Sequence, residues 1–143
     1  MNIELTKAND SDLEFLIKLR SLTMANQLNK IGIILSQEEN LLRVKSNFES
    51  IFIIQQLDEN IGMIKYIKTE NFIEIIQFQI LPSYQRKGVG KYVINQLCLT
   101  AKSSDKKLKL KVLKDNPAKK LYEQFNFVVV DSDEHEFHMQ YDA

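Results

Sequence analysis

The chain has 143 residues, of which 44% are hydrophobic and 27% charged, and this composition is typical of a single globular domain spanning residues 1–143. Lys plus Arg and Asp plus Glu number 19 each, so the positive field of a nucleic-acid-binding protein is missing and nucleic acid is not the expected partner. No apolar run is long enough to cross a bilayer and the N-terminus lacks a signal-peptide pattern, so we expect a cytoplasmic protein with no membrane partner.

The sequence contains one cysteine, Cys98, which excludes an intramolecular disulfide and a cysteine-based metal cluster, and we expect no metal site. Cys98 stands among Ile94, Leu97 and Ala101 at helical spacing. We therefore predict a buried structural thiol rather than a nucleophile.

The first third of the chain predicts a short strand and two helices. Ile3–Thr6 has the pattern of an edge strand, and the polar run that follows predicts a helix start with Asp10 or Ser11 as its N-cap. A second helix is expected after Ser36, because Glu39 stands three residues later, as in a capping box. The segment between them, residues 20–35, shows little periodicity and is predicted to be irregular.

The next part predicts an antiparallel meander. Its strands are residues 51–56, 61–68 and 72–81, with polar turns at residues 58–60 and 69–71. A helix over residues 89–102 and a strand over residues 108–112 follow.

The last part begins at a second clear helix start. Asn116 is a preferred N-cap and Pro117 suits the first helical position, while Asn126 fits a left-handed residue that ends the helix. Residues 127–130 and 134–141 then predict a terminal hairpin.

The loop between the third meander strand and its following helix carries features of an anion site. Gly88 and Gly90 let a ligand approach the backbone, and Arg86, Lys87 and Lys91 add positive charge near the start of the helix. A pyrophosphate suits such a loop, although two glycines at this place form an ordinary turn about equally often. The loop has neither the third glycine of a dinucleotide fingerprint nor the Gly-Lys-Ser/Thr of a P-loop.

Two motifs resemble those of the GNAT superfamily of N-acetyltransferases. The hexapeptide from Gln85 to Gly90 is similar to that family's Gln/Arg-x-x-Gly-x-Gly/Ala signature between a strand and a helix. Residues 116–127 resemble its later Asn-x-x-Ala-x-x-Leu-Tyr-x-x-x-Gly-Phe pattern, with Ala118 offset and Asn126 in place of the glycine. The order of elements over nearly the whole chain is also similar to the GNAT fold.

The resemblance implies an α/β (α+β) fold and a cofactor. The expected fold is a mixed, mostly antiparallel central sheet of about six to seven strands, flanked by about four helices and splayed where acetyl-coenzyme A binds. Loop amides would hold the pyrophosphate, and the pantetheine arm would run between residues 72–81 and 108–113. The implied cofactor-binding residues are Ile80, Leu81, Gln85, Arg86, Lys87, Gly88, Val89, Gly90, Lys91, Asn116, Ala118 and Tyr122.

The resemblance also implies catalytic roles. Tyr122 would be the general acid for the departing thiolate, although by spacing alone it belongs to the core stripe of its helix. Glu74 would act as the base, directly or through water, or else be a solvated strand carboxylate. A backbone N–H near Ile80 would stabilise the oxyanion. His138 is interpreted as a strand histidine that could line the acceptor pocket.

The function implied is transfer of the acetyl group of acetyl-coenzyme A to a primary amine of a small molecule or peptide, by direct attack in a ternary complex, in a monomer or homodimer. The alternative is a catalytically silent acyl-coenzyme A-binding module that acts as a sensor or partner subunit. A third, weaker hypothesis is a nucleic-acid binder that uses the lysines between Lys102 and Lys120.

Overall fold

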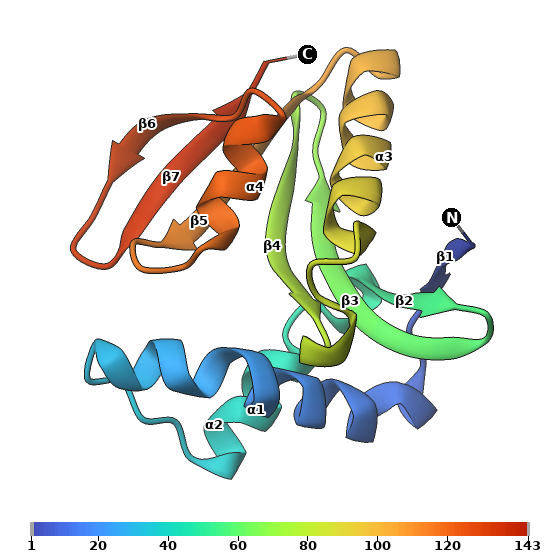
Figure 1. The fold of residues 1–143 in the computed structure, drawn as a ribbon, viewed down its shortest axis with the longest axis vertical. Helices are drawn as coiled ribbons and strands as arrows, with labels where there is room; N and C mark the ends of the chain where they lie inside the picture. Colours follow the sequence, from blue (N-terminus) through green and yellow to red (C-terminus); the bar gives the residue numbers. More distant parts are fainter. Residues whose placement is uncertain (1, 143) are drawn as a thin grey trace. The chain divides into compact units, whose positions relative to one another are not determined.

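The computed structural model describes residues 2–142, and within this range it leaves out the side chains of residues 25–27. Figure 1 shows the helices and strands in chain order. With η denoting 3-10 helices, they are β1 (Ile3–Lys7), η1 (Asp10–Asp12), α1 (Leu13–Lys30), α2 (Gln37–Lys45), η2 (Phe48–Ser50), β2 (Ile51–Gln56), β3 (Glu59–Lys68), β4 (Phe72–Ile80), η3 (Pro82–Tyr84), α3 (Val89–Ser103), β5 (Lys107–Leu113), α4 (Ala118–Gln124), β6 (Val128–Ser132) and β7 (Glu136–Tyr141).

The strands form one hydrogen-bonded sheet of seven strands in the order β1-β2-β3-β4-β5-β7-β6. β2 pairs antiparallel with β1 and β3, and β7 pairs antiparallel with β5 and β6. β4 and β5 pair in parallel, from Phe72 opposite Lys107 to Ile75 opposite Leu110. The predicted mixed, mostly antiparallel sheet is therefore confirmed.

The chain divides into two compact units, neither of which is continuous in sequence. The first unit contains Met1–Lys65 and Gln77–Gln85, and the second contains Tyr66–Ile76 and Arg86–Ala143. The division cuts β3 and β4, so each of these strands contributes residues to both units.

In the first unit, α1 and α2 pack against each other beside the strands (Figure 1). Ile51 and Ile53 stand two residues apart on β2, and Met63 on β3 pairs with Ile53. The three side chains therefore lie on one face of the sheet. They form a core with buried helix residues that include Leu16, Leu19 and Val44. Burial of this apolar surface holds the two helices on the strands.

The entry to α1 differs from the prediction. Asn9, and not Asp10 or Ser11, is the N-cap: its side chain accepts from the Ser11 N–H at 2.9 Å, and the Asp12 carboxylate accepts from the Asn9 N–H at 2.9 Å. This reciprocal pair caps the turn η1, and α1 then begins at Leu13. The reciprocal bonds between Asn9 and Asp12 form a capping box and so make Asn9 the cap.

The length of α1 also differs from the prediction. Residues 20–30, predicted to be irregular, continue α1 to Lys30, because the helix-breaking residue in this region comes only at Gly32, whose φ is +79°. The predicted capping box at α2 is confirmed, with Ser36 Oγ accepting from the Glu39 N–H at 3.1 Å.

The turn between β2 and β3 is tighter than predicted. Leu57 and Asp58 make it alone, with φ values of 50° and 66°, and β3 already begins at Glu59. A two-residue turn with both residues left-handed follows the right-handed twist of the paired strands, so the predicted turn residues Glu59 and Asn60 pair within the ladder instead.

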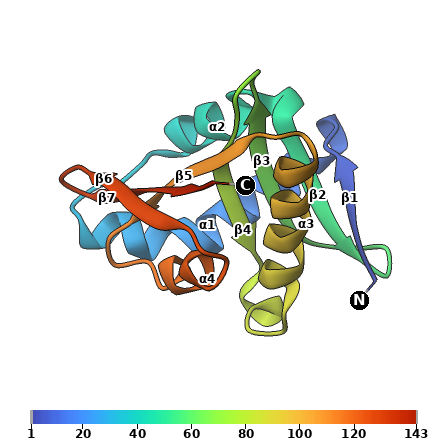
Figure 2. The same cartoon turned by 90° about the horizontal axis from the view of Figure 1, so that it is seen from above.

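In the second unit, α3 packs on β5 and on α4, and β6 and β7 form the predicted terminal hairpin beside β5 (Figure 2). Asn126 ends α4 with φ of 68°, the left-handed conformation predicted for it. Among the described residues, no helix is long and apolar enough to cross a membrane.

Gly62 allows a close approach of backbone within the first unit, and its replacement should be costly. A Cβ at this position would lie 2.5 Å from the Gln79 carbonyl oxygen. Because backbone must shift to relieve this overlap, Gly62→Ala should lower the free energy of unfolding by about 1–3 kcal/mol. Urea unfolding measures this loss. Lys68→Ala, an exposed change on the same strand, should stay within about 0.5 kcal/mol, and equal losses in the two variants would contradict the steric argument.

The β6–β7 turn should make stability depend on acid pH. Asp133 Oδ2 lies 2.9 Å from His138 Nε2, and Oδ1 accepts from the backbone N–H groups of His135 and Glu136. The His138 contact and the two backbone bonds lower the pKa of Asp133 from 3.8 to about 2.

A depressed folded-state pKa stabilises the protein above the unfolded-state value, and this contribution is lost as the pH falls through the folded-state value. The difference in unfolding free energy between the wild type and Asp133→Asn should therefore be full above pH 4 and shrink between about pH 4 and pH 2. Asp131→Asn is the control. A difference that stays constant down to pH 2 would show that the Asp133 contacts do not depend on its charge.

Candidate functional site

The turn that precedes α3 combines two left-handed residues. Arg86 has φ of 61° and Gly88 has φ of 86°, whereas Lys87 between them does not have positive φ. Left-handed residues beside residues of negative φ can turn backbone N–H groups toward one side, as in an anion-binding nest. Gly88 is the N-cap of α3, and its carbonyl accepts from the Tyr92 N–H at 3.0 Å.

The charge around this turn also favours an anion. Arg86, Lys87 and Lys91 have exposed side chains, and the first turn of α3 contains no acidic residue. These cations add to the positive end of the helix dipole and to the N–H groups that the first helical turn leaves without intrahelical acceptors. The turn can therefore bind a phosphate or pyrophosphate group.

The residues that follow fix this turn in place. Val89 is buried and Gly90 half-buried at the start of α3. The buried stripe of α3 continues through Val93, Leu97 and Ala101, and the helix packs on β5 and α4. Burial of this stripe sets where the first turn of α3, and with it the row of N–H groups, lies within the second unit.

Three of the predicted binding residues belong to the first unit. Leu81 packs against the core there, and its N–H donates to the Ile61 carbonyl at 2.8 Å. The exposed Gln85 donates from Nε2 to the Ile80 carbonyl oxygen at 2.9 Å. The side chain of Gln85 thus ties the start of the loop to the end of β4, a structural role that sequence analysis did not assign to it.

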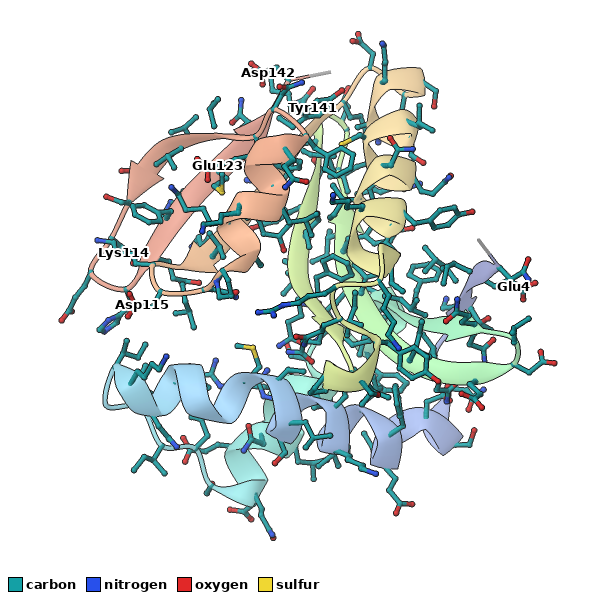
Figure 3. All side chains as sticks on the ribbon, in the orientation of Figure 1. Glu4, Lys114, Asp115, Glu123, Tyr141 and Asp142 are labelled. Atoms are coloured by element: carbon teal, nitrogen blue, oxygen red, sulfur yellow. The ribbon has the colours of Figure 1, made fainter. Side chains whose placement is uncertain are left out.

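α4 begins at Ala118 with Pro117 at its N-cap position, one residue later than predicted, but Asn116 still caps the first turn through its side chain. Its side-chain oxygen accepts from the Ala118 N–H at 2.9 Å, and its carbonyl accepts from the Lys119 N–H at 3.2 Å. Lys114 and Asp115 precede it in the connection from β5, as Figure 3 shows. Because Asn116 is half-buried and fixes the first turn of α4, it also sets the position of Tyr122 further along that helix.

Tyr122 is a buried residue with a polar end. The residue is 6% exposed, and its ring lies 5.7 Å from that of Phe127. Burial raises the pKa of its hydroxyl above the usual value, so the group keeps its proton at neutral pH. Its position is thus compatible with a residue of the core stripe of α4 and with a general acid, because the buried hydroxyl holds a proton that it could donate.

Glu74 lies on β4, in the part of the strand that belongs to the second unit. Its neighbours Ile73 and Ile75 are buried, whereas Glu74 is half-buried and points to the other face of the sheet. In the parallel register it stands opposite Lys109, whose ammonium lies 3.6 Å from the Phe72 ring centroid. Glu74 therefore presents a carboxylate on the half-buried face of the sheet.

Cys98 and His138 have the structural roles predicted for them. Cys98 is buried and free, and burial raises the pKa of its thiol to about 11. It is therefore not a nucleophile at neutral pH. His138 lies half-buried on β7 and pairs with Asp133 in the adjoining turn.

A cluster of cations in the first unit was missed by the sequence analysis. Arg20 on α1 and Lys65 on β3 are 4% and 1% exposed. A signal was present, because Lys65 continues the alternation of Ile61 and Met63 on the buried face, and Arg20 stands one turn after Leu16. Two long charged side chains at core positions are unusual and need a physical reason.

The structure thus brings the turn before α3, Asn116, Ala118 and Tyr122 into one unit on elements that pack together, with Glu74 on a strand of the same unit. Ile80, Leu81 and Gln85 belong to the other unit. The cofactor-binding and catalytic roles of these residues stay predictions.

Comparison with known proteins gives the family. The model of the acetyltransferase (GNAT) domain matches residues 47–129. The acetyltransferase PseH of Campylobacter jejuni subsp. jejuni serotype O:23/36 (strain 81-176) is 29% identical over 141 residues, which cover 94% of this chain and 88% of that protein.

Solved structures show the fold. An acetyltransferase from Thermus thermophilus has a TM-score of 0.81 at 14% identity, covering 100% of this chain and 98% of its own. The PaiA N-acetyltransferase from Thermoplasma acidophilum, solved in complex with coenzyme A, has a TM-score of 0.73 at 23% identity and covers 100% of both chains. Because the family model spans more than half of the sequence, the chain belongs to the GNAT acetyltransferase family.

Proposed function

We propose that this chain binds acetyl-coenzyme A and transfers its acetyl group to a primary amine of a small molecule or peptide, by direct attack in a ternary complex. The observation that carries the proposal is the turn from Arg86 to Gly90, with two left-handed residues and three cations at the start of α3, in a chain of the GNAT acetyltransferase family. The coenzyme A complex of the T. acidophilum structure supports this choice of cofactor.

The residues of the turn fit the phosphate part of coenzyme A. Gly88 has no Cβ at the place where the backbone is left-handed, and the first N–H groups of α3 have no acceptors within the helix. Arg86, Lys87 and Lys91 supply positive charge for the pyrophosphate. When bound, the cofactor supplies an acetyl group activated as a thioester.

Tyr122 is proposed as the general acid. Transfer to an amine leaves a thiolate, which needs a proton. A tyrosine whose pKa is raised by burial holds its proton throughout the neutral range, so it is available for donation. Asn116 orients this residue by capping the helix that carries it.

Glu74 is proposed as the base. An alkylammonium with a pKa near ~10 cannot attack a carbonyl carbon until it loses a proton. Glu74 offers a half-buried carboxylate on the face of the sheet opposite to the buried residues Ile73 and Ile75. It would accept the proton directly or through a water molecule.

Direct transfer is favoured by the state of the one cysteine. A covalent acyl-enzyme route through a thiol needs a thiolate, and burial raises the pKa of Cys98 to about 11. We therefore place no thioester on the protein, and the amine attacks the bound donor itself.

Gly88 provides the test of cofactor binding. In Gly88→Ala a Cβ at φ of 86° costs roughly 1–2 kcal/mol, so the turn should relax and its N–H groups should no longer converge. Calorimetry should show coenzyme A binding weakened by about tenfold or more. Gly32→Ala is the matched control, because Gly32 has φ of +79° with nothing within 4 Å of an added Cβ. Unchanged affinity in Gly88→Ala would remove the turn from the binding site.

Variants of Tyr122 and Glu74 test the proposed acid and base. Release of thiol from acetyl-coenzyme A should be followed from pH 6 to pH 10 across a panel of amines. Tyr122→Phe should lower kcat by about 10² or more, because the donor proton is lost while the ring stays in the core. Glu74→Gln should lower kcat most strongly below the pKa of the amine, where the ammonium form must lose a proton.

Tyr141→Phe is the control for these variants, because its ring also contacts Phe127, at a centroid distance of 5.6 Å. If Tyr122→Phe turns over as fast as the wild type at every pH, Tyr122 is a core residue only. Tight binding of coenzyme A without turnover of any amine would instead favour a catalytically silent module.

A further inference from the structure

Two buried cations of the first unit, Arg20 and Lys65, form hydrogen bonds with residues at α2, and one nitrogen of Arg20 has no hydrogen-bond partner among the described residues. Arg20 on α1 donates from Nε to Asn40 Oδ1 on α2 at 3.0 Å. Its Nη1 is buried and is, among the described residues, the one buried side-chain nitrogen or oxygen without a hydrogen-bond partner. A guanidinium has five N–H donors in a fixed fork, so both donors of Nη1 remain without an acceptor.

Lys65 brings a second buried charge to the same place. Its Nζ donates to the carbonyl oxygens of Ser46 at 2.6 Å and Arg43 at 3.1 Å, at the end of α2. Burial, and then the nearby charge of Arg20, lower the pKa of Lys65 to about 8. Burial and the charge of Arg43 in turn lower the pKa of Arg20. The charge of Arg20 thus acts on Lys65, and the charge of Arg43 acts on Arg20.

No carboxylate of the described residues forms an ion pair with these cations. Glu49 acts on Lys65 only through its longer-range charge, which favours the protonated form. Burying a charge without a counter-ion costs several kcal/mol, and leaving a charged donor without an acceptor adds to this cost. A core that needed only stability would place apolar residues at these positions, so the cluster points to a negatively charged group that is not part of the chain.

We propose that Arg20 binds an oxyanion, either a carboxylate or a phosphate group, and that the charge of Lys65 adds to the attraction. An oxyanion fits because its oxygens accept N–H bonds from a guanidinium and offset the positive charge of both residues.

The test measures anion binding without any activity. Thermal unfolding is followed with increasing inorganic phosphate, against chloride at the same ionic strength. Phosphate should raise the Tm of the wild type by about 3 °C or more at saturation. Arg20→Met keeps the apolar stem and removes the guanidinium, so the rise should fall to the part that the turn before α3 contributes. Lys18→Met, which removes an exposed cation from the same helix, should keep the full rise.

If Arg20→Met does not fold, Arg20→Lys decides, since it keeps the charge but loses the fork and should show a clearly smaller rise. An equal rise in the wild type and in the folded Arg20 variants, or no rise in the wild type, overturns the oxyanion site.

Failure of this site and failure of the proposed function are distinguishable, because thermal unfolding requires no acetyl transfer. If phosphate stabilises the wild type clearly more than Arg20→Met, and no amine is acetylated, the oxyanion site stands while the proposed acetyl transfer fails. If amines are acetylated but the phosphate rise is equal in the wild type and the folded Arg20 variants, the transfer stands and the oxyanion site fails.

Discussion

The left-handed backbone at Gly88 is the constraint on which the candidate site depends. Its φ of 86° lets the chain enter α3 with the first N–H groups of the helix exposed, and a side chain at this position would be strained. The buried stripe of α3 packs the helix on β5, and this packing fixes the position of the turn. Conformational freedom at one residue and apolar burial along the helix that follows thus fix the turn that we propose as the anion site.

Burial acts on two side chains of the second unit with opposite consequences. It raises the pKa of the Cys98 thiol and of the Tyr122 hydroxyl, because both groups would have to be ionised in surroundings that solvate charge poorly. For a thiol the effect removes reactivity, since only the thiolate attacks. For a phenol the same effect keeps the group protonated at neutral pH.

The first unit contains the opposite case, in which two cationic side chains are buried. Lys65 offsets part of its desolvation with two carbonyl acceptors at the end of α2, where the helix dipole is negative. Arg20 donates from Nε to Asn40, whereas its buried Nη1 has no hydrogen-bond partner among the described residues. The core around the two helices otherwise consists of apolar residues such as Leu19 and Val44. Apolar burial thus holds the two helices together while the polar demand of Arg20 is only partly met.

The sequence by itself determined the elements that rest on local chemistry: the capping box at Ser36, the helix start at Asn116, the left-handed end at Asn126 and the helical spacing that buries Cys98. These depend on neighbours within a few residues, which the sequence displays directly. Only the tertiary structure decided that α1 continues to Lys30, that Gln85 bonds back to Ile80 and that Arg20 and Lys65 are buried together. Those features depend on packing and on partners that become neighbours only in the folded chain, which no local pattern records.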